Sequence, residues 1–288
     1  MSQLTATRQS NLTAPNQSIE AANGVTFAYR RFGNTDSAAL PLVCFQHYRG
    51  NLDNWDPALV DAIAEQREVI LFDNAGVGGS SGTVPHTVTP MAYDALAFID
   101  ALGLEQIDIL GYSMGGFVAQ ELTLIRPLLV RRLILAGTGP QGGVEQHGYR
   151  DEVNGNAVAD EPGAEDLLAL FFERSETSVA KGWEFVERIF TRTEDRDVGT
   201  DLRTRDAQLD AVTTWGIPDA SRLNRLAGIT QPVLAVNGEN DRMVPTPNTF
   251  LLAERLPNAQ LKIYPDAGHG FLFQYPAEFA AELEGFLA

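Results

Sequence analysis

The order of apolar and helical patterns along the chain limits its possible folds more than its composition does. Short apolar runs alternate with segments of helical periodicity, and several runs are apolar throughout, as in strands buried on both faces. The expected strands cover residues 25–29, 40–46, 69–72, 107–111, 133–136, 233–236 and 261–264. The expected helices cover residues 57–65, 88–103, 114–126 and 276–287. Repeated strand–helix units of this kind predict an α/β fold, with a mostly parallel sheet flanked by helices.

One long segment, residues 140–224, interrupts this alternation. It is rich in charged residues and glycine, it has helix-like spacing, and no convincing strand pattern occurs in it. We therefore expect a core formed by residues 19–139 and 225–288, with a helical insertion at 140–224. Residues 1–18 are polar and are expected to form a flexible N-terminal tail.

The net charge of the chain disfavours roles in nucleic-acid or membrane binding, and its cysteine content rules out an internal disulfide. The 288-residue chain carries a formal net charge of −17, which disfavours binding to nucleic-acid phosphates or to anionic lipid. Its one cysteine, Cys44, cannot form an internal disulfide. The N-terminal segment does not resemble a signal peptide, and no apolar stretch approaches the ~20 residues that span a bilayer. We expect a cytoplasmic protein that acts on a small molecule, and the sequence leaves its oligomeric state open.

The segment Gly111-Tyr112-Ser113-Met114-Gly115 lies between an expected strand and an expected helix. A serine on a sharp strand-to-helix turn is exposed for nucleophilic attack, and small residues two positions away on either side relieve the crowding. The Met114 N–H lies at the helix N-terminus, where it can stabilise a developing oxyanion. A Gly-x-Ser-x-Gly motif in this context predicts a nucleophile elbow with Ser113 as the nucleophile.

With this motif, the chain from about residue 24 onward resembles the α/β-hydrolase family. The resemblance implies an acid after a late strand and a histidine before the last helix. Asp241 lies in a segment similar to the family's acid loop, and His269 lies in a Gly-His loop. We expect His269 to act as the general base and Asp241 to orient it. Glu239 and Asp266 are rival acids.

The family usually provides a second oxyanion donor from a His-Gly-x segment after an early strand. Here the segment reads His47-Tyr48-Arg49, so the resemblance assigns this role to the Arg49 N–H, although tyrosine replaces the usual glycine. The Arg49 side chain can bind an anionic substrate group or serve a structural role.

The resemblance also implies that the insertion forms a lid, or cap, over the active site. Some of its aromatic side chains should then line an apolar substrate pocket. The candidate substrate-binding residues are His47, Tyr48, Tyr112, Trp183 and Trp215.

These features predict a serine hydrolase that cleaves an ester or lactone of a small, largely apolar substrate through an acyl-enzyme. Such chemistry requires no metal or organic cofactor, and the sequence has no ligand spacing of the zinc type. A carbon–carbon bond hydrolase, an acyltransferase and a cofactor-free perhydrolase use the same triad and remain alternatives. A ligand receptor that retains the triad is a further alternative from a different class.

Overall fold

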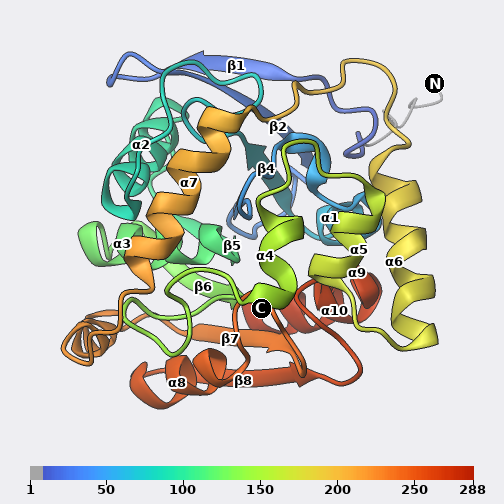
Figure 1. Ribbon diagram of the computed structural model, residues 1–288. Helices are drawn as coiled ribbons and strands as arrows, with labels where there is room; N and C mark the ends of the chain where they lie inside the picture. Colours follow the sequence, from blue (N-terminus) through green and yellow to red (C-terminus); the bar gives the residue numbers. More distant parts are fainter. Residues whose placement is uncertain (1–8) are drawn as a thin grey trace, which may run out of the picture.

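The computed structural model describes residues 9–288, and an eight-stranded sheet forms its centre (Figure 1). The strand order is β1-β2-β4-β3-β5-β6-β7-β8. The strands from β3 to β8 run parallel, whereas β2 is antiparallel to both β1 and β4. Their bounds are β1 Gln17–Glu20, β2 Thr26–Gly33, β3 Leu42–Phe45, β4 Glu68–Phe72, β5 Ile107–Tyr112, β6 Val130–Ala136, β7 Val233–Gly238 and β8 Ala259–Tyr264.

Helices cover both faces of this sheet, which explains why β3, β5 and β7 are buried along their whole length. Helices α2 (Val88–Ala101), α3 (Met114–Ile125) and α8 (Pro247–Arg255) contribute to the core on one face. Helices α1 (Pro57–Ala64), α9 (Phe271–Gln274) and α10 (Pro276–Leu287) contribute to the core on the other face. Figure 1 shows α2 and α3 on one side of the sheet and α1 and α10 on the opposite side.

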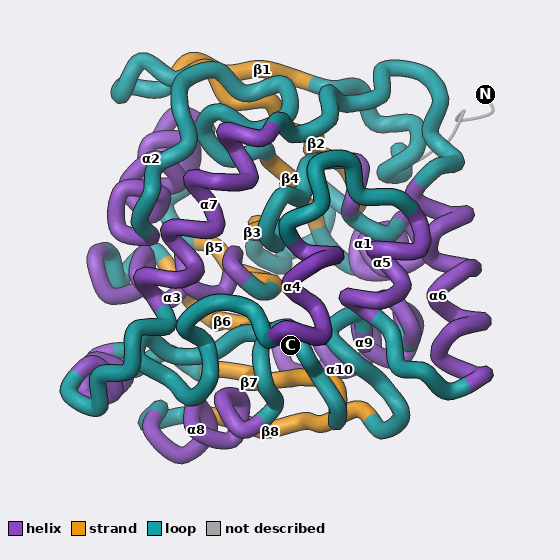
Figure 2. The backbone as a smooth tube through the Cα atoms, in the orientation of Figure 1, coloured by secondary structure: helices purple, strands orange, loops and turns teal. Residues whose placement is uncertain are grey.

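The segment between β6 and β7 contains four α-helices and no strand. These helices are α4 (Asp151–Ala157), α5 (Ala164–Phe171), α6 (Glu176–Ile189) and α7 (Leu202–Trp215), and the 3-10 helix η2 (Arg222–Gly228) follows them. In Figure 2, α7 lies on the side of α2 and α3, whereas α6 lies on the side of α1. Trp215 at the end of α7 stacks on Phe117 of α3, and Arg188 of α6 pairs with Asp56 beside α1. The insertion is therefore attached to the core on both sides of the sheet.

The expectation of a flexible tail at residues 1–18 is wrong for its described part, and residues 1–8 lie outside the described residues. The Asn11 N–H donates to Asp61 at 2.6 Å, and Ala14 is fully buried. Residues 17–20 form β1 at the edge of the sheet. An edge strand with a single apolar residue has no hydrophobic run, so its sequence pattern resembles that of a loop.

None of the helices from residue 9 onward is long and apolar enough to cross a membrane.

Candidate active site

Ser113 occupies the turn between β5 and α3 in a backbone conformation that serine rarely adopts. Its φ is 55° and its ψ is −121°. The surrounding structure holds this conformation: the Ser113 N–H donates to the Ala136 carbonyl at 2.9 Å, and the Ser113 carbonyl accepts from Thr138 Oγ1 at 2.7 Å. Strain of this kind persists only where neighbouring contacts compensate for it, and it is typical of functional residues.

The glycines on either side of Ser113 are required by close packing. A Cβ on Gly115 would overlap the carbonyl oxygen of Phe45 at the end of β3. A Cβ on Gly111 would lie 2.8 Å from the Cα of Gly116. The turn therefore has the tight geometry that the Gly-x-Ser-x-Gly pattern predicts.

Asp241 and His269 form a buried pair beside this turn. His269 Nδ1 lies 2.7 Å from Asp241 Oδ2, and the two side chains are almost completely shielded from solvent. The other carboxylate oxygen accepts the N–H groups of Met243 and Val244, at 2.8 and 3.0 Å. The carboxylate is thereby fixed as the acceptor of the Nδ1 proton, which leaves Nε2 of the neutral ring as the basic nitrogen.

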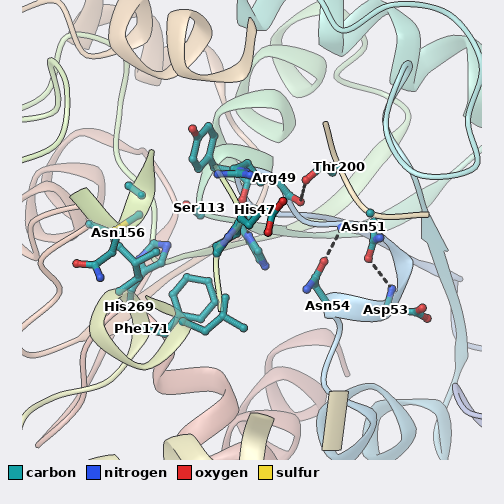
Figure 3. A pocket seen from close by; sticks show the side chains of 18 of the residues that line it. His47, Arg49, Asn51, Asp53, Asn54, Ser113, Asn156, Phe171, Thr200 and His269 are labelled. Atoms are coloured by element: carbon teal, nitrogen blue, oxygen red, sulfur yellow. Dashed lines mark hydrogen bonds between the residues drawn. The ribbon is translucent and has the colours of Figure 1, made fainter. Parts of the chain in front are cut away.

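His269 Nε2 is buried and has no hydrogen-bond partner among the described residues. It lines the same cavity as Ser113 (Figure 3). No hydrogen bond joins it to Ser113 in the described part of the chain. Long nucleophile–base distances are common in free enzymes, and they shorten when substrate binds.

Tyr112 and Gly137 hold the imidazole of His269 in place. The Tyr112 ring stacks on it with 5.0 Å between the ring centroids, and the Tyr112 hydroxyl donates to the His269 carbonyl at 3.0 Å. Gly137 lies so close that a Cβ there would be 3.2 Å from His269 Nδ1. Tyr112 was expected to contact substrate, but it does not line the cavity and instead supports the histidine.

Of the three candidate acids, only Asp241 contacts His269 within the described residues. Asp266 accepts a hydrogen bond from Ser175 Oγ at 2.9 Å, and Glu239 is exposed. Ser113, Asp241 and His269 all follow the carboxyl ends of parallel strands, which meet at one edge of the sheet.

The two predicted oxyanion donors differ in their surroundings. Met114 is the first residue of α3, so its N–H has no acceptor in the preceding turn of its own helix. The Arg49 N–H, in contrast, donates to Gln208 Oε1 of α7 at 2.6 Å. The expectation that this N–H is available to an oxyanion therefore does not hold in this structure, because Gln208 must first release it.

The backbone around Arg49 also explains how the segment accommodates Tyr48. The Gly50 N–H donates to the His47 carbonyl at 3.1 Å, and the positive φ of 61° falls on Arg49 rather than on Tyr48. This is the pattern of a type II turn, in which only the third residue needs the left-handed region. Tyrosine at the usual glycine position is thus free of that strain.

The guanidinium group of Arg49 binds the insertion. Its Nη1 donates to the Ala159 carbonyl at 2.6 Å and its Nη2 to the Asp160 carbonyl at 3.3 Å. These contacts support the structural interpretation of Arg49 rather than its use in binding an anionic substrate group.

The cavity above Ser113 has a volume of about 370 Å³ and is lined by both core and insertion. Figure 3 shows Phe171 and His269 on one side of Ser113, with Asn51, Asp53 and Asn54 on the other side. The apolar lining residues include Ala157, Leu167, Leu170, Phe171 and Met243. The charged lining residues are Arg49, Asp53, Asp160, Glu161, Arg196 and Asp197. Acids outnumber bases in this lining, so the cavity does not favour an anionic ligand.

The substrate-binding expectations are met only in part by this lining. His47 and Tyr48 line the cavity, as expected. Trp183 lies outside it with 43% of its surface exposed, and Trp215 is buried against Phe117 with its Nε1 bonded to the Gly139 carbonyl. The helical spacing that marks both tryptophans as part of the insertion does not distinguish a pocket position from a core or surface position.

Two insertion segments that line the cavity, at Phe171 and at Asn156, had no distinguishing signal in the sequence. Phe171 at the end of α5 is fixed to the histidine loop because its carbonyl accepts the Gly270 N–H at 2.6 Å. Arg242, beside the predicted acid, donates to the Phe172 carbonyl at 2.8 Å.

No group of three or more potential metal-ligating side chains occurs among residues 9–288.

Comparisons with known proteins identify the fold family of this chain. A family model described as the alpha/beta hydrolase fold matches residues 41–276. The chain is similar to the solved structure of an alpha/beta hydrolase fold protein from Chitinophaga pinensis, with 43% identity, a TM-score of 0.90 and coverage of 97% of this chain and 99% of that one. It is also similar to the solved structure of Est816, an N-acyl homoserine lactone degrading enzyme, with 25% identity, a TM-score of 0.74 and coverage of 94% and 100%. A putative carbamate hydrolase from Caulobacter sp. is 29% identical over 81% of this chain and 85% of its own length.

Proposed function

Because this chain belongs to the α/β hydrolase fold family, we propose that it cleaves a carboxylic ester or lactone of a small, largely apolar substrate through an acyl-enzyme. The observation that carries the proposal is the buried Asp241–His269 pair, joined by a 2.7 Å contact, at the same cavity as the strained Ser113. A carboxylate, an imidazole and a serine in this relation perform nucleophilic acyl transfer.

In the first half of the reaction, Ser113 Oγ attacks the carbonyl carbon while His269 Nε2 takes the hydroxyl proton. The Met114 N–H stabilises the negative charge on the carbonyl oxygen. The Arg49 N–H can add a second hydrogen bond if Gln208 moves away. When the intermediate collapses, the carbon–oxygen bond to the leaving group breaks, and His269 gives its proton to the departing alkoxide. A lactone is opened in the same step, and its hydroxyl remains tethered to the acyl-enzyme.

In the second half, His269 Nε2 takes a proton from water as the water oxygen attacks the acyl carbon. The carbon–oxygen bond to Ser113 then breaks, and the proton returns to Ser113. Asp241 accepts the Nδ1 hydrogen bond and stabilises the imidazolium that forms in each half. Residues 140–224 act as the lid in this proposal, since α4 and α5 provide part of the lining.

The size and charge of the cavity support a small, uncharged substrate. A volume of about 370 Å³ is at the lower end of the range for small-molecule sites. Four acidic side chains and two arginines lie around it, and both arginines already bind backbone carbonyl groups. The names of two similar proteins, an N-acyl homoserine lactone degrading enzyme and a putative carbamate hydrolase, refer to cleavage of carbonyl compounds, which agrees with acyl transfer to water.

The test is the hydrolysis of p-nitrophenyl acetate, butyrate and octanoate by the wild type and three variants. We expect Ser113→Ala to lower kcat/KM by at least about 10³-fold and Asp241→Asn by about 10²- to 10⁴-fold. Asp266→Asn is the matched control, because it alters a rival acid in the histidine loop, and it should change kcat/KM less than about threefold. Equal rates for wild type and Ser113→Ala would contradict the proposal.

Competing acceptors separate the alternatives that share the triad. Product analysis with added alcohol or hydrogen peroxide identifies an acyltransferase or a perhydrolase by the ester or peracid formed. Hydrolysis that dominates in the presence of both acceptors is the expected result. A wild type that turns over none of the esters would contradict ester hydrolysis and favour a carbon–carbon bond hydrolase or a receptor.

A further inference from the structure

His47 is a second histidine in the catalytic cavity, and the proposed reaction does not use it. It lies two residues after the end of β3 and lines the cavity together with Ser113 and His269 (Figure 3). Only 6% of its surface is exposed. A buried polar side chain in a catalytic cavity with no role in the chemistry calls for another explanation.

The hydrogen bond at one ring nitrogen fixes the protonation of the other. His47 Nδ1 lies 2.8 Å from the backbone carbonyl oxygen of Tyr48. A carbonyl can only accept a hydrogen bond, so Nδ1 carries the proton and Nε2 of the neutral ring has a free lone pair. Burial, together with the nearby His269, lowers the pKa of His47 to about 4, so the ring is neutral at pH 7. His47 Nε2 is therefore an acceptor and cannot donate.

This acceptor is buried and has no hydrogen-bond partner within residues 9–288. Close packing prevents the His47 ring from rotating towards a hydrogen-bond partner. The rings of Phe171 and Tyr112 contact it edge-on, with centroid distances of 5.1 and 5.5 Å. Gly50 lies so close that a Cβ there would be 2.9 Å from His47 Cε1. A fixed, unpaired acceptor favours a ligand that brings a donor to it.

We propose that His47 Nε2 accepts a hydrogen bond from the substrate, and that it selects esters or lactones with a hydroxyl or amide N–H near the scissile carbonyl. The donor belongs near that carbonyl because His47 and His269 line the same cavity as Ser113 and both contact the rings of Tyr112 and Phe171. The donor group of the substrate need not carry a positive charge, since the acceptor is neutral. The inference rests on the proposed function and specifies its substrate class.

The experiment compares pairs of lactones that differ only in the donor. One pair is α-hydroxy- and α-methyl-γ-butyrolactone; the other is α-acetamido-γ-butyrolactone and its analogue with CH₂ in place of the N–H. We expect the wild type to have a kcat/KM about tenfold higher for the donor-bearing member of at least one pair, as one buried neutral hydrogen bond permits.

Two variants distinguish the effect of the acceptor atom on substrate preference from the effect of side-chain shape. In His47→Asn, the side-chain amide can still donate to the Tyr48 carbonyl, but no atom occupies the position of Nε2. We expect the ratio of the two kcat/KM values to fall to about one. His47→Gln places an oxygen near the position of Nε2 and should retain part of the preference. Circular dichroism and thermal unfolding establish that both variants are folded.

A wild-type ratio near one in both pairs, or a ratio that His47→Asn leaves unchanged, would overturn the role of His47. Absence of lactone turnover by the wild type would count against the proposed function instead. In that case, calorimetric binding of the same pairs to Ser113→Ala decides the inference: tighter binding of the donor-bearing lactone, lost on further His47→Asn substitution, supports it. Equal binding of both members contradicts it.

Discussion

At the scale of single residues, the arrangement depends on close approaches that only certain side chains permit. Gly137 follows β6 with a φ of 54°, and it packs against the rings of His269 and Tyr112. The absence of a side chain there gives the imidazole the space beside Asp241. Residues that never contact substrate can thus determine whether the base is correctly oriented.

We predict that Gly137→Ala lowers kcat about tenfold or more, because a Cβ 3.2 Å from His269 Nδ1 displaces the ring. Gly103→Ala is the matched control: Gly103 has a similar positive φ of 70°, but nothing lies within 4 Å of a Cβ there. Both variants should lose about 1 kcal/mol of unfolding free energy from backbone strain. Esterase kinetics and urea unfolding measure the two effects, and equal kcat values for both variants would contradict the role of Gly137.

The pH dependence of stability provides a second test at this scale. Folding lowers the pKa of His47 from its ordinary value of 6.5 to about 4, because the buried ring resists protonation. A lowered pKa means that the stabilising contribution is present above pH 6.5 and is lost as the pH falls towards 4. Relative to His47→Asn, the wild type should lose up to about 3 kcal/mol of unfolding free energy between pH 7 and pH 4. Urea unfolding of both proteins at several pH values checks this prediction. Parallel curves of unfolding free energy against pH for the wild type and His47→Asn would refute it.

The sequence predicts individual site residues where their role depends on neighbouring positions in the chain. Ser113 has flanking glycines and the strand-to-helix context, while Asp241 and His269 each follow an apolar strand. The state of the Arg49 N–H was not predictable, because its partner, Gln208, lies 159 positions away on α7. The same limit applies to Trp183 and Trp215, whose surroundings depend on how the insertion packs.

At the scale of helices and strands, the insertion is held to the core by a few buried polar contacts. Arg188 on α6 donates to both carboxylate oxygens of Asp56, at 2.8 and 2.7 Å. The same carboxylate accepts the Ala58 N–H and so caps the first turn of α1. The Asp56 side chain is fully buried, so the arginine compensates for a charge that water cannot reach.

We predict that Arg188→Met lowers the free energy of unfolding by about 2–4 kcal/mol, because it leaves the Asp56 carboxylate buried and unpaired. Lys181→Met on the same helix is the control, since its pair with Glu184 is exposed at both ends. It should cost no more than about 0.5 kcal/mol. Chemical denaturation of both variants tests this, and a similar loss in the two would show that the Arg188–Asp56 pair does not stabilise the docked insertion.

Most core elements were predictable from hydrophobic patterning because they are long or apolar throughout. The strands β2 to β8 coincide with expected runs to within a few residues, whereas β1, α8 and α9 were not expected. The edge strand β1 lacks an apolar run, and α9 contains only 4 residues, too few to display a helical period. Within the insertion, the sequence predicts helices but not their individual bounds or their packing.

At the scale of the whole molecule, the parallel sheet and the insertion perform separate tasks. The sheet brings residues from distant parts of the chain to the carboxyl ends of β5, β7 and β8. Helices α4 and α5 of the insertion provide part of the cavity lining. In the proposed reaction the catalytic groups therefore belong to the core, while the shape of the cavity depends on the packing between the core and the insertion, which a single sequence does not reveal.

The central claim is that Ser113 is an activated nucleophile, and covalent labelling tests it most directly. We would incubate the protein with an alkyl fluorophosphonate, which traps activated serines, and locate the adduct by peptide mass spectrometry. We predict one adduct, on Ser113, with none in Ser113→Ala and labelling slowed at least about 10²-fold in His269→Ala. The absence of an adduct in the wild type, or a stoichiometric adduct on another residue, would contradict the claim.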